Sequence, residues 1–200
     1  MQLIFATHNP GKVVEMRAIL AGLSVEISSA EEVGVHEDVV EDGVTFAENA
    51  LKKARFVSQR TGQWAVADDT GLSIDALDGA PGVFSARWAG EGATAEQLVA
   101  YTLNELDGVP EHRRSAWFET AAAIVSPDGQ EWVFTGKLEG MIPMEPRGTP
   151  RERLPYDAIF IPEGQTRTFA EMSDEEKNSL SHRGDAFRQL KALLQQVIAQ

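Results

Sequence analysis

The stretch from Trp64 to Asp75 reads WAVADDTGLSID, an apolar run that meets two adjacent carboxylates. Trp64 to Ala67 has the composition of a buried strand, whereas Asp68 to Gly71 consists of residues that favour turns. The pattern therefore predicts that the strand ends at Ala67 and presents both acids at its end. Acids in such a place either cap nearby backbone and face water, or stand where a ligand binds.

Strand and helix signals alternate around this stretch. Gln2 to Phe5 is an apolar strand, and after a turn Asn9 and Pro10 have the composition of a helix start. The backbone amides of such a start face the preceding loop and suit phosphate. A second helix begins with a capping box at Thr45 to Glu48 and ends at Gly62.

One lysine of this second helix lies on its apolar side. At 100° per residue, Lys53 falls about 20° from Phe46, with Asn49 close by. Either its ammonium extends past the edge of the core to water, or it reaches into a site. The buried stripe itself is expected to consist of Phe46, Ala50, Ala54 and Val57.

The remaining elements complete an alternating pattern. An ordered loop is expected at 79–82, followed by a helix over 94–106 with Leu98, Tyr101 and Leu106 inward. A hairpin with arms at 117–125 and 132–138 and a strand at 158–161 come next. The chain ends in a helical region that begins with a capping box at 173–176 and is interrupted at Gly184. The alternation predicts an α/β fold on a mixed sheet, with residues 1–200 forming a single domain.

The charge and composition of the chain exclude several classes of function. The net charge of −13 argues against a nucleic acid polymer as partner, because such binding depends on basic surface. The absence of cysteine excludes disulfides and thiolate metal sites and favours a hard cation such as Mg²⁺. The chain has neither a run of about 18 apolar residues nor the zones of a signal peptide. We therefore expect a cytoplasmic protein that does not enter a membrane.

Three groups of side chains together resemble a phosphate site. They are the amide-rich turn that ends in Lys12, the acids Glu41, Asp42, Asp68 and Asp69, and the cations Lys177, His182 and Arg183. Carboxylates can hold Mg²⁺ against substrate phosphates, and a further carboxylate can deprotonate a water. The turn lacks the spacing of a Walker motif, which disfavours a P-loop enzyme. Alternatively, the acids are ordinary turn residues and the sequence around His182 is an exposed helix break.

Several motifs in order carry a family resemblance. They are Thr7-His8-Asn9 with Lys12 and Glu15, Phe46 to Ala50 with Lys53-Ala54, Ala67 to Leu72, Gly79 to Gly82 with Ser85-Ala86-Arg87, and Ser181-His182-Arg183. Over nearly its whole length the chain resembles the inosine triphosphate pyrophosphatase family, the pyrophosphatases of non-canonical purine nucleoside triphosphates.

The resemblance implies an activity and an architecture. The family hydrolyses ITP, dITP and XTP to the monophosphate and pyrophosphate with Mg²⁺, which cleanses the nucleotide pool. Its members are homodimers with an elongated mixed sheet, flanking helices and two lobes around a central nucleotide cleft. We therefore expect a small-molecule nucleoside triphosphate as substrate.

The resemblance also implies roles for individual residues. Glu41 and Asp69 would hold Mg²⁺, Asp69 would accept the proton of the attacking water, and Asp68 would support them. Thr70 would touch the substrate. The triphosphate would lie against Thr7, His8, Asn9, Pro10, Gly11, Lys12 and Lys53, and the base would be recognised by Lys177, His182 and Arg183.

The chain departs from the family in one element of the base site. Before Tyr156 and Asp157 the family has Gly-Phe-Gly, whose aromatic ring stacks on the base, but here Leu154 and Pro155 precede them. Leucine offers an apolar face without π-stacking, and proline stiffens the turn. Selectivity for ITP or XTP is therefore expected to be weaker. Two alternatives stay open: a house-cleaning pyrophosphatase with broader or modified-pyrimidine specificity, and a nucleotide sensor without catalysis.

Overall fold

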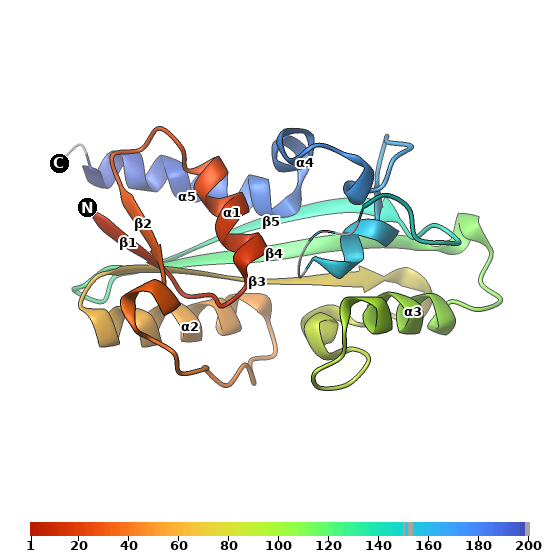
Figure 1. Cartoon of the computed structure of the whole chain (residues 1–200), viewed down its shortest axis with the longest axis horizontal. Coiled ribbons are helices and arrows are strands. Elements are labelled where there is room, and N and C mark those ends of the chain that lie inside the picture. The colour runs from red at the N-terminus through yellow and green to blue at the C-terminus, as the bar shows by residue number, and fades with distance from the viewer. Residues whose placement is uncertain (150, 152–153, 199–200) are drawn as a thin grey trace.

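The computed structural model describes residues 1–149, 151 and 154–198 and shows helices on both faces of an elongated sheet (Figure 1). In the described residues the sheet has six strands in the order β2-β1-β3-β4-β5-β6. The strands are β1 (Gln2–Phe5), β2 (Glu26–Ser29), β3 (Trp64–Ile74), β4 (Ser115–Val125), β5 (Glu131–Met141) and β6 (Ile161–Pro162), and the α-helices are α1 (Pro10–Ile19), α2 (Phe46–Thr61), α3 (Ala95–Glu105), α4 (Asp174–Leu180) and α5 (His182–Ile198).

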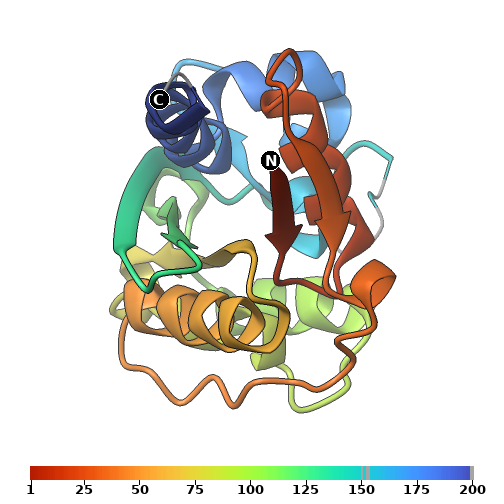
Figure 2. The same ribbon diagram turned by 90° about the vertical axis from the view of Figure 1, so that its left-hand side faces the viewer.

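The sheet is mixed, which confirms the predicted fold class. β1 pairs in parallel with β2 and β3, whereas β3 to β6 form antiparallel pairs. The helices α2 and α3 lie on one face, and α1, α4 and α5 lie on the other (Figures 1 and 2). Apolar side chains fill the layers between helices and sheet, in one cluster under α2, one under α1 and α5, and one around α3 at the far end. The buried stripe predicted for α2 is confirmed.

The prediction that β3 ends at Ala67 is wrong. The strand continues to Ile74, and residues 65 to 74 pair with β4 without interruption. The continuous main-chain pairing outweighs the turn preference of the acids, and Asp68 and Asp69 face the small side chains Ala122 and Ala121 across the ladder. The strand that ends here is β1, whose last residue Phe5 pairs with Val66. Beyond that point β3 loses its neighbour on one side, and Asp69 borders the cavity there while Asp68 is buried.

Two further expectations need correction. The segment predicted as a strand at 158–161 is mostly a 3₁₀ helix, Pro155–Ile159, followed by the short β6. The C-terminal helices are separated at Ser181, which has extended backbone, and not at Gly184. Gly184 lies within α5, where an added Cβ would meet the carbonyl oxygen of Asn178 at 2.1 Å. The lack of a side chain at Gly184 therefore permits close packing of α4 on α5, and the residue does not break the helix.

The other elements agree with expectation in kind. The predicted helix over 94–106 is α3. The prediction that Tyr101 faces inward is wrong, because this residue is 38% exposed and packs edge-on against Trp88. The predicted hairpin is β4 and β5, and the capping box at Ser173 is present. None of the helices in the described part of the chain combines the length and apolarity needed to cross a membrane.

Candidate active site

A cavity of about 760 Å³ opens where β1 ends beside β3. This volume is typical of small-molecule sites. Pro10, Gly11, Asp68 and Lys177, all predicted to serve the site, do not form part of its wall. The predicted site residues that do line the cavity are Thr7, His8, Asn9, Lys12, Glu41, Lys53, Asp69, Thr70, Leu154, Pro155, Tyr156, Asp157, His182 and Arg183.

The loop between β1 and α1 is held by its own side chains. Asn9 caps α1, since its Oδ1 accepts hydrogen bonds from the amides of Gly11 at 3.0 Å and Lys12 at 3.4 Å. The hydroxyl of Thr7 accepts the amide of Asn9 at 3.1 Å. Pro10 and Gly11 form the first turn of the helix and give the loop its fixed backbone. Lys12 then projects into the cavity from this turn.

Asp68 lies on the α5 side of β3 in a cationic environment. Its Oδ2 is 3.0 Å from Lys12 Nζ and 3.2 Å from Arg183 Nε, and it accepts the hydroxyl of Thr70 at 3.0 Å. Burial alone would raise the pKa of this carboxyl, but Lys12 and Arg183 outweigh it and hold the pKa well below its usual range. Asp68 is therefore a fixed anion that anchors two cations. Its Oδ1 is buried and has no hydrogen-bond partner in the described residues.

Asp69 faces the α2 side and has the opposite electrostatic character. Its Oδ2 accepts a hydrogen bond from Asn49 Nδ2 at 3.0 Å, and its Oδ1 lies 3.7 Å from Lys53 Nζ. Burial raises the pKa of Asp69, and Lys53 only partly offsets this. Neighbouring carboxyls whose environments push their pKa values apart are typical of a pair with different chemical roles. Asp69 is therefore the more basic of the two carboxylates.

Glu41 joins Asp69 beside the same lysine. Lys53 Nζ lies 3.1 Å from Glu41 Oε2, and Glu41 and Asp69 outweigh burial and raise the pKa of Lys53. Within the described residues no group of three or more acids or histidines is arranged to hold a metal ion. Mg²⁺ needs only one or two protein carboxylates beside water and phosphate oxygens, so the donor chemistry of Glu41 and Asp69 suits this ion.

The opposite end of the cavity has a buried imidazole and a wall of apolar side chains. The ring of His182 stacks on Phe118 with centroids 4.5 Å apart, and its Nδ1 has no hydrogen-bond partner in the described residues. Burial and the neighbouring Arg183 lower the pKa of His182 well below its ordinary value, so the imidazole is neutral. The interpretation of this segment as an exposed helix break is therefore wrong, because both His182 and Arg183 are buried.

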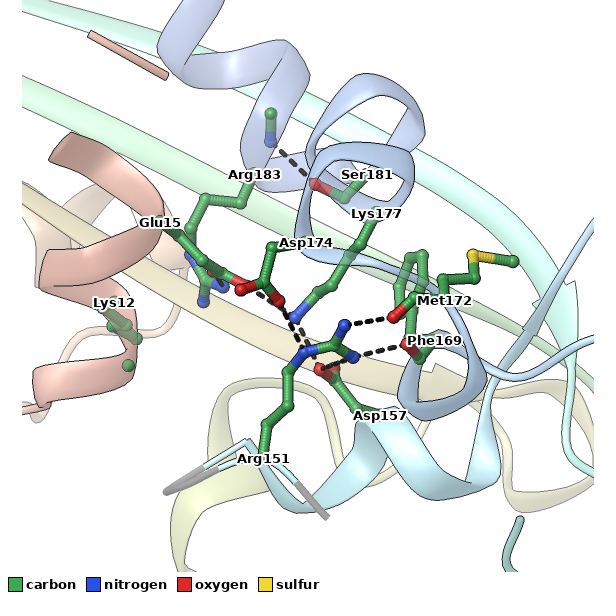
Figure 3. A network of polar contacts seen from close by, with 12 residues as sticks. Lys12, Glu15, Arg151, Asp157, Phe169, Met172, Asp174, Lys177, Ser181 and Arg183 are labelled. Atoms are coloured by element: carbon green, nitrogen blue, oxygen red, sulfur yellow. Dashed lines mark hydrogen bonds and ion pairs between the residues drawn. The ribbon is translucent and has the colours of Figure 1, made fainter. Parts of the chain in front are cut away.

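Lys177 lies in a buried ion network behind the cavity wall (Figure 3). Its Nζ bonds to Glu15 and, at 2.6 Å, to Asp157, while Glu15 also bonds to Arg183. The structure thus places Lys177 where it supports Asp157 and Arg183, at 2% exposure, and not where it lines the cavity.

Two supporting residues had no predicted role. Glu15 joins Lys177 to Arg183, and Asn49 joins Asp69 to the Glu41 segment, since its Oδ1 accepts the amide of Gly43 at 2.8 Å. The helical spacing of both residues indicates that they lie near the site. Glu15 is one turn after Lys12, and Asn49 is one turn before Lys53, so each shares a face with a site lysine.

Comparisons with known proteins agree on one family. The family model described as "Ham1 family" matches residues 3–193. A dITP/XTP pyrophosphatase of Streptomyces avermitilis is 47% identical over 199 residues, covering 98% of each chain. That of Bacillus subtilis is 42% identical over 194 residues, covering 97% of each. The solved structure of a HAM1 protein from Coxiella burnetii superposes with a TM-score of 0.87 at 38% identity, covering 98% of this chain and 99% of that one.

Proposed function

The chain belongs to the Ham1 family, and we propose that it hydrolyses non-canonical purine nucleoside triphosphates, dITP or ITP and XTP, to the monophosphate and pyrophosphate. Relatives that align over 98% of this chain carry the name dITP/XTP pyrophosphatase. The observation that carries the proposal is the pair of adjacent acids beside the end of β1. Asp69 lines the cavity and has a raised pKa, and Asp68 lies behind it, tied to two cations. This arrangement suits the hydrolysis of an acid anhydride by a deprotonated water.

The cations at the β1 end of the cavity would bind the triphosphate. Lys12 and Lys53 reach the cavity from the first turn of α1 and from α2, and Thr7, His8 and Asn9 of the preceding loop line the same space. These positive charges oppose the charge on the phosphates and stabilise the departing pyrophosphate. In phosphoryl transfer such positioning and electrostatic stabilisation supply most of the reduction in barrier.

Asp69 would take the proton of the water that attacks the α-phosphorus. A new P–O bond forms to the water oxygen, the bond to the β-phosphate oxygen breaks, and pyrophosphate leaves. Asn49 holds one oxygen of Asp69, which fixes the direction of the other. Glu41 and Asp69 would hold Mg²⁺. The ion, when bound, neutralises charge on the phosphate oxygens.

The His182 end would receive the base. The neutral imidazole of His182 lines the cavity and would hydrogen-bond to a base, and Leu154, Pro155 and Tyr156 supply an apolar wall. Donors that face the 6-oxo group of hypoxanthine or xanthine would be left unpaired against the amino group of adenine. This difference is the physical basis for selectivity. The homodimer, which the family resemblance implies, and the cytoplasmic location, which the sequence pattern led us to expect, are likewise proposals.

A panel of substrates tests this function. With Mg²⁺, we expect the highest kcat/KM on dITP and XTP and lower values on ATP, GTP and modified pyrimidine triphosphates, with phosphate detected only after inorganic pyrophosphatase is added. Equal rates on ITP, XTP, ATP and GTP would refute the selectivity and leave the pyrophosphohydrolase. A preference for modified pyrimidines would support the house-cleaning alternative, and no turnover of any substrate would support the sensor.

A further inference from the structure

The wall at the base end of the cavity consists of a segment without long regular structure. Leu154, Pro155, Tyr156 and Asp157 all line the cavity, and three of them begin the short 3₁₀ helix Pro155–Ile159. On one side, the hydroxyl of Tyr156 donates to the carbonyl oxygen of Ser85 at 2.7 Å. A short segment like this needs further contacts to keep its side chains in one place.

Arg151 supplies such contacts from within the same segment (Figure 3). Its guanidinium donates from Nη2 to the carbonyl oxygen of Met172 at 2.6 Å and from Nη1 to that of Phe169. It also pairs through Nε with Asp174 Oδ1 at 3.0 Å and through Nη1 with Asp157 Oδ2 at 3.4 Å. One planar group thus joins its own segment to both ends of the 3₁₀ helix Phe169–Glu171 and to the start of α4.

The backbone couples Arg151 directly to Leu154. The two residues form an isolated antiparallel bridge, in which the amide of Leu154 donates to the carbonyl oxygen of Arg151 at 3.2 Å. The amide of Asp157 donates in turn to the carbonyl oxygen of Leu154 at 3.2 Å. A displacement of Arg151 therefore displaces Leu154, the side chain that stands where the family has its stacking aromatic ring.

Asp157 completes the connection to the buried network. Its carboxylate lies between Arg151 and Lys177, and burial raises its pKa, which the ammonium of Lys177 only partly offsets. The side chain of Arg151 is itself only 18% exposed. Solvent therefore screens these contacts less than it screens a surface ion pair.

We propose that Arg151 is a positioning residue for base recognition, which holds Leu154 and its neighbours at the distance that a purine base requires. The inference rests on the proposed function, because it assigns the base to this end of the cavity. Arg151 does not line the cavity and so acts through Leu154 and Asp157. A wall that binds the base equally in the ground state and the transition state affects KM and not kcat.

The test compares Arg151→Lys with the wild type on ITP and ATP. Lysine keeps the charge but loses the planar fork. We expect KM for ITP to rise roughly tenfold, because binding of the base must then also order the Leu154 wall, with kcat within about threefold and a lower ratio of ITP to ATP specificity. Arg151→Met, which also removes the charge, should raise KM at least as much. If Arg151→Met does not fold, Arg151→Lys alone decides.

The matched control is Arg167→Lys, at an exposed arginine that bonds to Glu171 and Glu176 in the same region. It should leave KM, kcat and selectivity at wild-type values. Unchanged KM and selectivity in Arg151→Lys would overturn the inference, as would a fall in kcat or melting temperature without a change in KM. A wild-type protein that hydrolyses no purine triphosphate would overturn the proposed function and this inference together, whereas an active wild type with an unchanged variant overturns only the inference.

Discussion

Replacing Asp69 with asparagine is expected to lower kcat for ITP by about 10²- to 10⁴-fold, the range that a positioned general base contributes. Asparagine preserves the shape of the side chain but cannot accept the proton of the attacking water at neutral pH. The expectation rests on the raised pKa of Asp69 and on its contact with Asn49, which fixes the carboxylate at the cavity. The measurement is steady-state kinetics of pyrophosphate release at saturating ITP.

The fold should survive this substitution, because Asp69 borders the cavity and is not the centre of the buried ion network. Thermal unfolding and circular dichroism check this point. Asp107→Asn, at an exposed aspartate after α3, makes the same chemical change and should retain wild-type kinetics. A folded Asp69→Asn enzyme with kcat within tenfold of the wild type would show that another group takes the proton.

Replacing Asp68 with asparagine is expected to destabilise the protein by about 3–5 kcal/mol at pH 7, the cost of breaking a buried ion pair from one side. Lys12 and Arg183 would keep their charges next to a neutral amide. The folded-state pKa of Asp68 is lowered, so its contribution to stability is present above the unfolded pKa of about 4 and is lost as the pH falls through the lower folded value.

Urea unfolding at pH 7 and at lower pH measures both parts of this expectation. The difference in free energy of unfolding between wild type and Asp68→Asn should shrink as the pH falls below about 4. Glu131→Gln breaks the exposed pair with Arg55 and should change stability little, because solvent screens that pair. An Asp68→Asn protein as stable as the wild type at pH 7 would contradict the ionic role assigned to this carboxylate.

The sequence predicted the kinds of element better than their ends. Capping residues and apolar stripes are local signals, and for that reason the start of α1 at Asn9 and the buried face of α2 were predictable. The continuation of β3 through its acids was not, because it depends on pairing with β4 some 50 residues later along the chain. The turn preference at Asp68 and Asp69 wrongly predicted the end of β3, although the cavity does open beside Asp69, where β1 ends.

Most residues of the candidate site were predictable from the sequence, but the different environments of its two adjacent acids were not. The family resemblance implied Asp68, Asp69, Lys53 and Glu41 as one group, whereas only the structure shows that alternate faces of β3 give the two acids opposite environments. The contacts of Lys177 and Arg151 depend on which segments meet behind the cavity wall. No local pattern carries that information, since their partners come from separate helices and loops.

The position of water attack tests the central claim most directly. The protein is incubated with ITP and Mg²⁺ in water enriched in ¹⁸O, and both products are analysed by mass spectrometry. If Asp69 directs water to the α-phosphorus, the monophosphate carries one ¹⁸O atom and the pyrophosphate carries none. Label in pyrophosphate would place the attack on the β-phosphorus and would contradict the account of water attack at this site, whereas labelled free phosphate beside a nucleoside diphosphate would also contradict the pyrophosphohydrolase activity.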